Sequence, residues 1–403
     1  MQLNLIAFAV PLFVSLMLIE FIVSKKQGKQ LFRFPEVIAN VNVGIGERLS
    51  DLFTTGLFYL FFQWVYEHYR IFTVPSGALS YVLLFIAADF VWYWYHRLGH
   101  EINIFWAAHG VHHQSEDFNY TVSARITVFQ AGFRCIFWSF LPLLGFHPAA
   151  ITLMLLIHGA YPFFTHTQVI GKLGWLEYFL VTPSHHRVHH SSNPEYLDTN
   201  YGDVLIIWDK LFGTFAKETV KPIYGLTKQL GSYSFLWQHF HLFLETGVAV
   251  SRVSGIGNKL RIMFGKPDVI DPDIRDMLEK RLLKRNTGTT PSANLYWYIS
   301  SQTIFTVAIL FFVILFENYE DTSGIWIAAV FILVSVISTG AMLEQKRWVF
   351  DLELCRLILA AIYIHAALPY PFLSMSMVVA IVLVVVFYKS LRTFYFNRLY
   401  VAG

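Results

Sequence analysis

Charge and cysteine are scarce in this sequence. Only 14% of its 403 residues are charged, and the formal net charge is +3. No basic face with interleaved stacking aromatics is present, which argues against a nucleic-acid-binding protein. The two cysteines, Cys135 and Cys355, lie within apolar runs and form no CxxC motif. We therefore expect neither a disulfide framework nor thiol chemistry.

Several common catalytic motifs are also missing. The sequence contains no HExxH, no GxSxG and no P-loop, so the hydrolase classes that depend on these motifs are excluded. The segment Gly44-Ile45-Gly46 does not continue into a dinucleotide fingerprint, and no bound nicotinamide is expected. Paired Glu-x-x-His motifs are lacking as well, which excludes a ferritin-type carboxylate di-iron bundle.

Apolar residues dominate the composition. They make up 55% of the chain, aromatic residues make up 17%, and the mean hydropathy is +0.49. This composition predicts an integral membrane protein. The first apolar run lacks a basic leading region and a small-residue cleavage site, so we interpret it as an anchor and not as a signal peptide. The apolar runs predict about nine transmembrane helices, near residues 3–23, 49–66, 76–95, 126–146, 149–166, 295–316, 324–343, 353–368 and 372–391.

The basic residues predict the orientation of these spans. A cluster that follows the first span places the next loop in the cytoplasm, because positive charge favours the cytoplasmic side; its members are Lys25, Lys26, Lys29 and Arg33. Counting alternately from there places the segments 97–125 and 167–294 on the cytoplasmic side. The membrane would be the endoplasmic reticulum in a eukaryote and the inner membrane in a bacterium.

We predict four regions along the chain. Residues 1–75 form N-terminal membrane helices, and residues 76–250 form a catalytic domain that contains the histidine motifs. Residues 251–294 are basic and are interpreted as a cytoplasmic linker, and residues 295–403 form a second set of spans. The run 233–250 is expected to lie in the membrane interface as an amphipathic helix. Its His239 and His241 are two residues apart and do not share a helix face, so a surface role is predicted for them.

The histidines of this sequence are clustered at regular spacings. The sequence contains HRLGH at 96–100, HGVHH at 109–113, HTQ at 166–168 and SHHRVHH at 184–190. Spacings of three and four residues place imidazoles on one helix face, and a neutral imidazole is a good ligand for divalent metals. Nine rings are too many for one ion and suit two ions with four or five ligands each. The predicted metal ligands are His96, His100, His109, His112, His113, His166, His186, His189 and His190.

Two further histidines stand beside this set. His185 precedes the last cluster and could be a ligand, a proton relay or a group that orients a ligand, of which we favour the last. His158 lies within a span, where a buried hydrogen bond is the preferred interpretation. A closed structural zinc site is an alternative for the whole set, although such sites usually use cysteine and only four ligands.

Acidic residues near the clusters could orient the ligating histidines and adjust their basicity. Asp89 lies seven residues before His96 within a predicted span, where a carboxylate is costly and indicates function. We expect it to accept the second ring N–H of a ligating histidine. Glu101 directly follows His100. We regard Glu101, Asp89 and His185 as candidate catalytic residues; weaker candidates are Asp117, Asn119, Asn200 and Asp203.

These motifs, with NYGDVLIIWDKLFGTF at 200–215, resemble the fatty acid hydroxylase/sterol desaturase superfamily over about residues 80–216. The stretch HRLGHEINIFWAAHGVHHQSEDFNY is similar to the alkylglycerol monooxygenase family, including the Glu after HRxxH and the SED after HH. The span-rich tail after residue 290 is also similar to that family. The expected fold is therefore an all-α integral membrane protein with a cytoplasmic helical cap that carries the histidine-rich dimetal site.

The resemblance implies a monooxygenase that uses two non-haem iron ions, dioxygen and tetrahydrobiopterin. It would hydroxylate the carbon next to the ether oxygen of an alkylglycerol, and the product would collapse to a fatty aldehyde and a glycerol derivative. It further implies that the nine histidines bind iron and that Glu101 acts near the pterin or the metal. Contacts to the phosphate or glycerol of a lipid could come from basic residues near the clusters, namely Arg97, Arg125, Arg187 and Lys210.

Two other functions stay open at this point. A sterol, fatty-acyl or carotenoid hydroxylase or desaturase of the same superfamily would take electrons from a redox protein. That donor would be external, because no haem-binding HPGG is present and His147-Pro148 is followed by two alanines. A zinc-binding or zinc-transporting membrane protein is the third possibility. Transport requires ligands at mid-membrane depth with access from both sides, whereas the predicted ligands lie at one face.

Overall fold

The computed structural model describes residues 3–283, 292–319, 322–367 and 370–400. Every named element within these ranges is helical, and the extended pairings are two isolated bridges, Leu180 with Leu205 and Ser191 with Tyr224. The prediction of an all-α protein is confirmed for the described residues. Residues 284–291 of the predicted basic linker lie outside them.

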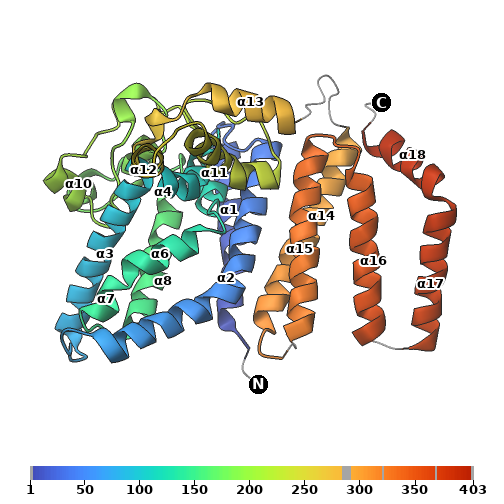
Figure 1. The fold of residues 1–403 in the computed structure, drawn as a ribbon, viewed down its shortest axis with the longest axis horizontal. Helices are drawn as coiled ribbons and strands as arrows, with labels where there is room; N and C mark the ends of the chain where they lie inside the picture. Colours follow the sequence, from blue (N-terminus) through green and yellow to red (C-terminus); the bar gives the residue numbers. More distant parts are fainter. Residues whose placement is uncertain (1–2, 284–291, 320–321, 368–369, 401–403) are drawn as a thin grey trace. The chain divides into compact units, whose positions relative to one another are not determined.

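The chain divides into two compact units (Figure 1). We call residues 16–231 and 238–283 the histidine unit, because they contain all the histidine motifs. We call residues 1–15, 232–237 and 284–403 the C-terminal unit. The four regions predicted from the sequence remain a prediction.

Long helices form the frame of the histidine unit. They are α1 (Ala9–Lys26, of which residues 16–26 belong here), α2 (Phe34–Tyr69), α3 (Ala78–Glu101) and α8 (Pro148–Thr165). The apolar core lies between α2, α3 and α8, where Phe62, Leu84, Trp138 and Ile151 are nearly inaccessible to solvent. Burial of side chains of this size is worth about 1.5–3 kcal/mol each.

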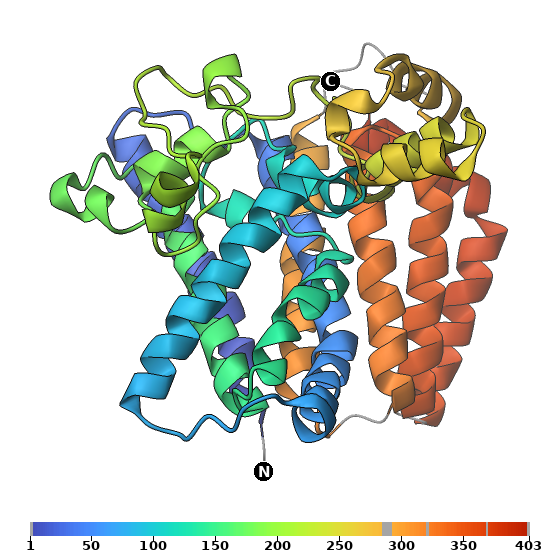
Figure 2. The same cartoon turned by 60° about the vertical axis from the view of Figure 1, so that its left-hand side comes forward.

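Short helices lie at the end of this frame at which α3 finishes, as Figure 2 shows. Glycine, proline and polar residues interrupt the sequence in this region and keep most of the helices short, apart from the 17-residue α11. These elements are α4 (Asn103–His109), η2 (Gly110–His113), α5 (Tyr120–Ser123), η3 (Gly174–Tyr178), α9 (Pro183–His189), η4 (Pro194–Tyr196), α10 (Ile207–Phe212), α11 (Phe235–Ser251), α12 (Ile256–Phe264), η5 (Pro267–Val269) and α13 (Asp273–Leu282).

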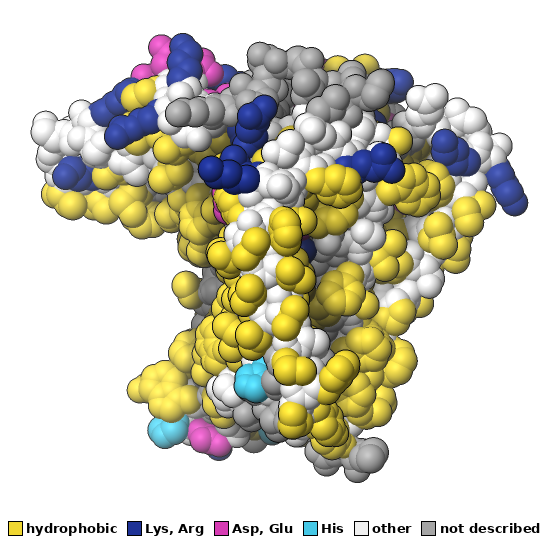
Figure 3. All heavy atoms as spheres, turned by 90° about the vertical axis from the view of Figure 1, so that its right-hand side faces the viewer, with side chains coloured by type: hydrophobic (Ala, Val, Ile, Leu, Met, Phe, Trp, Pro, Cys, Tyr) yellow, Lys and Arg dark blue, Asp and Glu magenta, His cyan; other side chains and the backbone are white. Residues whose placement is uncertain are grey.

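The C-terminal unit consists mainly of long apolar helices. They are α14 (Ala293–Leu315), α15 (Thr322–Leu343), α16 (Val349–Ala367) and α17 (Pro371–Val386). The unit also contains the four-residue η1 (Leu5–Phe8) and the more polar α18 (Tyr388–Leu399). In the face drawn in Figure 3, apolar side chains cover the helices and basic side chains gather near one end. Such a surface is typical of helices that lie in lipid.

Five helices are long and apolar enough to cross a membrane: Leu5–Lys26, Ala78–Glu101, Pro148–Thr165, Ala293–Leu315 and Thr322–Leu343. A sixth candidate is the pair Met375–Val386 and Tyr388–Leu399, which is bent by 79°. The sequence predicted about nine. The predicted span 126–146 is divided into α6 (Gln130–Trp138) and α7 (Phe140–Leu143), with Pro142 and Gly145 near the break. A multi-pass helical membrane protein is supported by these helices, with fewer clear spans than expected.

One local prediction is wrong. His239 and His241 of α11 were expected at a surface, but their exposed fractions are 1% and 0%. The His241 ring lies between two polar partners, since its Nδ1 is 2.9 Å from Glu245 Oε1 and its Nε2 accepts from Gln114 Nε2 at 2.8 Å. Gln114 directly follows the HGVHH motif, so α11 packs beside the histidine clusters and not at the surface.

Candidate metal centre

The nine predicted ligands gather into two groups. Group A contains five rings, those of His96, His100, His109, His113 and His189. Group B contains four, those of His112, His166, His186 and His190. Within each group, one ring nitrogen from every residue lies within 4.8 Å of all the others. All nine side chains are at most 9% exposed.

The HxxHH motif supplies both groups at once. Residues four apart on one helical turn point in the same direction, so His109 and His113 both join group A. His112, one residue from His113, points to group B. The second motif has the opposite division, because His186 and His190 join group B and His189 joins group A. The two groups are neighbours, since the rings of His113 and His190 stack with centroids 4.3 Å apart.

Nitrogen atoms face one another inside each group. In group B, His166 Nε2 lies 3.1 Å from His112 Nε2 and 3.0 Å from His186 Nε2. In group A, His109 Nε2 lies 3.1 Å from His96 Nε2 and 3.3 Å from His113 Nε2. Two nitrogens bound to the same ion, each at about 2.1 Å from it, would be separated by roughly 3 Å.

Backbone carbonyls determine which nitrogen carries the proton. The Nδ1 atoms of His112 and His166 lie 3.1 Å and 2.6 Å from the carbonyls of Arg125 and Pro162. A carbonyl can only accept, so each of these rings donates from Nδ1 and keeps a bare lone pair on Nε2. The same reasoning applies to group A, where His96 donates to Tyr201 O at 2.8 Å and His189 donates to Thr199 O at 3.0 Å.

A facing pair of lone pairs requires a cation between them. The His112–His166 contact cannot be a hydrogen bond, because both Nε2 atoms are acceptors. Protons are disfavoured there, since burial lowers the pKa of His166 to about 4, and burial together with the neighbouring rings lowers the pKa of His112 well below 6.5. The residues therefore fit a metal ion in each group. Two buried Nε2 atoms of group A without a hydrogen-bond partner agree with this, those of His100 and His189.

Asp89 differs from its expected role. Its carboxylate accepts hydrogen bonds from the backbone N–H of Val204 at 3.0 Å and of Leu205 at 3.2 Å, and from the Trp208 indole at 2.8 Å. None of its contacts involves one of the nine histidines, so the prediction that it accepts a ligand N–H is wrong. Asp89 instead holds the loop that follows Tyr201, whose carbonyl orients His96.

Asp209 is a residue that the sequence analysis missed. Its carboxylate accepts the N–H of Tyr201 at 2.7 Å and of Gly202 at 2.8 Å, and the hydroxyl of Thr214 at 2.7 Å. Together with Asp89 it fixes both ends of the loop 201–205. Burial raises the pKa of Asp209 to about 6. The only signal in the sequence was its place in the family-like stretch at 200–215.

Glu101 and His185 lie outside both groups. Glu101 forms an ion pair with Arg97 at 2.9 Å, one helical turn away, and about a quarter of each side chain is exposed. His185 caps the start of α9, where its Nδ1 accepts the backbone N–H of Thr182 at 3.4 Å. His185 therefore positions the helix that carries His186 and His189, and Glu101 directly follows His100 of group A.

The remaining candidates have structural partners. His158 forms the expected buried hydrogen bond, with its Nδ1 2.7 Å from Asp203 Oδ2. Asp117 pairs with Arg33 at 2.7 Å. Asn119 donates to Leu31 O, and Asn200 donates to the carbonyls of His185 and Ala216.

Two of the arginines proposed to contact lipid are already bound to other groups of the protein. Arg125 is 1% exposed, and its guanidinium donates to Val111 O, Asn40 and Gln114. Arg187 is paired with Glu218 at 2.7 Å. Both arginines brace the ligand-bearing helices and are not free to bind a headgroup, which corrects that interpretation.

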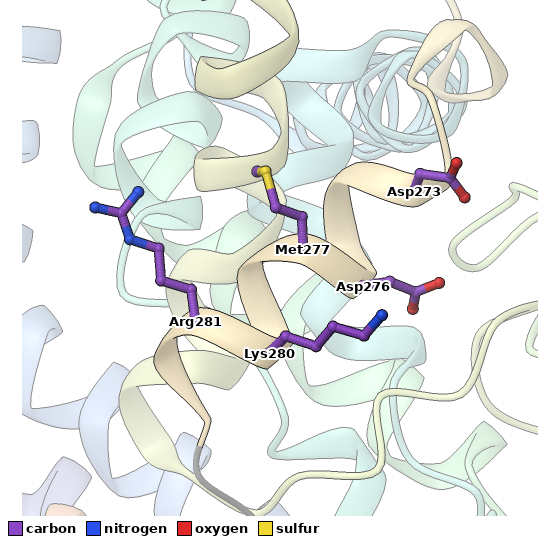
Figure 4. Close-up of a pocket in the computed structure, with 5 residues that line it drawn as sticks. All are labelled: Asp273, Asp276, Met277, Lys280 and Arg281. Atoms are coloured by element: carbon purple, nitrogen blue, oxygen red, sulfur yellow. The ribbon is translucent and has the colours of Figure 1, made fainter.

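A surface hollow exists elsewhere in the histidine unit. It is lined by five residues of α13, drawn in Figure 4: Asp273, Asp276, Met277, Lys280 and Arg281. All five side chains come from one helix, and none belongs to either histidine group. The hollow is therefore not the candidate site.

The comparisons with known proteins agree with this centre. The fatty acid hydroxylase family matches residues 81–214, which include all nine ring ligands. The chain is 33% identical to alkylglycerol monooxygenase of Homo sapiens over 363 residues, which cover 87% of this chain and 80% of the human protein. It is 31% identical to alkylglycerol monooxygenase of Danio rerio over 96% of this chain and 88% of that protein.

A more distant relative is ornithine lipid hydroxylase OlsE of Rhizobium tropici, which is 35% identical over 147 residues, 34% of this chain and 42% of that protein. No solved structure matches the chain. The two long alignments decide the relationship, because they extend well beyond the histidine motifs. The chain belongs to the alkylglycerol monooxygenase family of lipid monooxygenases, which carries the fatty acid hydroxylase domain.

Proposed function

We propose that the protein is a membrane-bound, non-haem di-iron monooxygenase that cleaves the ether bond of alkylglycerols. It would insert one oxygen atom of O2 into a C–H bond next to the ether oxygen, with tetrahydrobiopterin as the reductant. The hemiacetal so formed would break its C–O bond to release a fatty aldehyde and a glycerol derivative. The printed names of the long-aligned relatives support this substrate.

The observation that carries the proposal is the pair of facing Nε2 lone pairs of His112 and His166 in group B, together with the close approach of the Nε2 atoms of His96 and His109 in group A. The five rings of group A and the four of group B would each hold one iron ion. Bound iron would supply the activation of dioxygen. Imidazole nitrogen is a good ligand for iron, whereas Mg²⁺ and Ca²⁺ prefer oxygen ligands, so nine ring nitrogens favour iron over those two ions.

Residues of this chain would support the metal ions without touching the substrate. Asp89 and Asp209 would hold the loop whose carbonyls orient His96 and His189. His185 would position α9. We assign Glu101 to the rim of group A, where its carboxylate could contact the pterin or a metal-bound group when Arg97 releases it.

We further propose that the histidine centre faces the cytoplasm. Both groups lie where the membrane candidates α3 and α8 end. The loop after the first candidate span carries Lys25, Lys26 and Lys29. The positive-inside rule assigns that loop, and hence the histidine-bearing ends, to the cytoplasm.

A second candidate function is hydroxylation of a different lipid with electrons from an external redox protein. The match to an ornithine lipid hydroxylase favours it, although that alignment covers only about a third of this chain. A zinc-binding role remains as the third candidate, since imidazole is also a good zinc ligand.

The deciding experiment is turnover of a 1-O-alkylglycerol by protein purified in lipid nanodiscs. The proposal predicts about two iron ions per chain and fatty aldehyde only when tetrahydrobiopterin is added. Absence of aldehyde, together with hydroxylation of another lipid when a redox protein supplies the electrons, would support the second candidate. Zinc alone, without iron-dependent turnover, would support the third. The matched control is His68→Ala, because His68 is exposed and far in sequence from the motifs.

A further inference from the structure

Large apolar side chains project from two short segments of the histidine unit. The first runs from residue 173 to 179, and the second is the start of α10, residues 207–211. We call them together the apolar lip. Trp175 and Leu211 are 70% and 69% exposed. The other exposed members are Leu173, Tyr178, Phe179 and Ile207.

The lip is held by the backbone that connects its two segments. Ile206 donates its N–H to Phe179 O at 3.0 Å, and Val181 donates to Val204 O at 2.8 Å. Leu180 and Leu205 form an isolated bridge between them. These hydrogen bonds hold both segments in a defined conformation, so the apolar side chains are exposed on an ordered structure.

The lip is attached to a helix that can span the membrane. Trp208 of α10 donates its indole N–H to Asp89 of α3 at 2.8 Å, and its ring packs on Phe90 with centroids 5.1 Å apart. Phe212 packs on Trp94 at 5.2 Å. Asp89 lies seven residues before His96, which corresponds to about 10 Å along the helix at 1.5 Å per residue. Figure 1 shows α10 beside the upper part of α3.

The lip thus continues the lipid-facing surface of α3. Apolar residues of α3 that precede the contact are exposed in the same way, namely Leu79, Val82, Leu83, Ile86 and Phe90. On the α8 side, Tyr161 donates its hydroxyl to Val181 O at 2.6 Å, and Phe164 is 49% exposed. Both helices are long and apolar enough to cross a membrane, so the lip is connected to two candidate spans.

Basic residues border the apolar side chains. Lys210 donates to the carbonyls of Glu177 and Tyr178 at 3.4 Å and 2.7 Å, and its Nζ lies 5.5 Å from the Tyr178 ring centre. Lys172 lies just before the lip in sequence and is exposed. Tryptophan and tyrosine beside lysine are the combination found where the hydrocarbon of a bilayer meets its headgroups.

We propose that the apolar lip inserts into the headgroup boundary of the bilayer on the side of the histidine centre. Trp175, Phe179 and Leu211 would contact acyl chains, and Lys172 and Lys210 would contact anionic headgroups. The first segment of the lip lies in sequence between His166 and His186, and the second is tied to α3, which carries His96 and His100. We therefore expect a lipid that leaves the bilayer to pass the lip on its way to the metal centre.

Site-directed spin labelling tests this contact directly. Single cysteines at Trp175→Cys, Leu211→Cys and the exposed control Lys217→Cys are made in a Cys355→Ser background, since Cys355 is an exposed thiol and Cys135 is buried. The labelled, iron-loaded protein is measured in nanodiscs that contain anionic lipid. The proposal predicts that labels at 175 and 211 collide more with membrane-dissolved oxygen than with an aqueous nickel chelate, and that position 217 shows the opposite.

Two results would overturn the proposal. Equal or greater nickel access at positions 175 and 211 would place the lip in water. Shielding of both labels from oxygen and from nickel would indicate that a protein surface covers it. Retained iron content in each variant shows that the labelled protein is folded, so every reading counts for or against membrane contact.

A kinetic measurement extends the test and rests on the proposed ether-cleaving function. The double variant Trp175→Ser/Leu211→Ser should raise the apparent KM for bilayer-presented alkylglycerol several-fold while kcat is retained. A short-chain alkylglycerol dissolved in water should show no such change in KM. A fall in kcat with unchanged KM would contradict a role in lipid entry. If no alkylglycerol is cleaved at all, the proposed function fails, while the labelling result still decides the membrane contact.

Discussion

The two units of this protein bury polar groups in different ways. In the histidine unit, nine imidazoles and the side chains of Asp89, Asp209 and Arg125 lie almost without solvent contact. In the described part of the C-terminal unit, the buried charges form one pair, Glu353 and Arg356, at 3.0 Å. Tyr298 and Ser335 complete that pair with hydrogen bonds. The histidine unit therefore contains many buried polar side chains, whereas the C-terminal unit is mostly a bundle of apolar helices.

Backbone geometry explains the difference. A long helix uses almost all of its carbonyls for its own hydrogen bonds, so none is left to orient a buried ring. The C-terminal unit is built from such helices. In the histidine unit, loops and helix ends leave carbonyls free, and those of Pro162, Thr199 and Tyr201 accept ring N–H groups. Short, interrupted helices are therefore what allows a dense histidine centre.

The largest expected effect on that centre comes from removing a ring of group B. His186→Ala leaves three ligands and no replacement donor nearby, so the iron of group B should be lost. We expect activity to fall by more than about 100-fold, beyond what loss of an orienting partner usually causes. Iron analysis and aldehyde production measure both effects. Full activity with two retained iron ions would contradict the ligand assignment.

Removal of metal should make the stability of the histidine unit depend on pH. Burial holds the pKa of His166 near 4 in the folded protein, below the ordinary value of 6.5. The unfolded chain then takes up protons more readily, so stability should decline as the pH falls from about 6.5 toward 4. Thermal unfolding of chelator-treated protein between pH 7 and pH 5 checks this. The iron-loaded protein should be less sensitive to pH over that range.

A smaller effect is expected from the loop behind the rings. Asp209→Asn replaces an acceptor of two backbone N–H groups with an amide that can accept with only one oxygen. The Tyr201 carbonyl should then hold His96 less firmly, and the iron affinity should fall by about 10–100-fold. Competition with a chelator measures the affinity. Asp273→Asn on the exposed surface of α13 is the control and should leave the affinity unchanged.

The smallest effect on the metal centre should come from the C-terminal unit. Arg356→Met leaves Glu353 buried without its cation and should lower unfolding stability by about 3–5 kcal/mol. The iron content of the folded fraction should stay the same. Adding Glu353→Gln should restore much of the stability, because no unpaired charge then remains. A loss of iron equal to that of His186→Ala would show that the two units are not independent in this respect.

The helical class and the nine histidines that gather in the structure could be predicted from the sequence because both depend on local order. Apolar runs of helix length predict membrane helices. Histidines four residues apart share a helix face whatever the surrounding structure is. The number of spans was harder to predict. One apolar run is divided at Ser139 into α6 and α7, three residues before Pro142, and composition over a window cannot detect that break.

The sequence alone determined that this protein is a helical membrane protein with nine histidines at metal-ligand spacing, because composition and spacing act within a few helical turns. Only the tertiary structure decided that His112 and His113, adjacent in sequence, face different groups. It also revealed the roles of Asp209 and the burial of His241, and corrected the role of Asp89. These features depend on contacts between segments that are distant in sequence, and such contacts form only when the long helices bring the loops together.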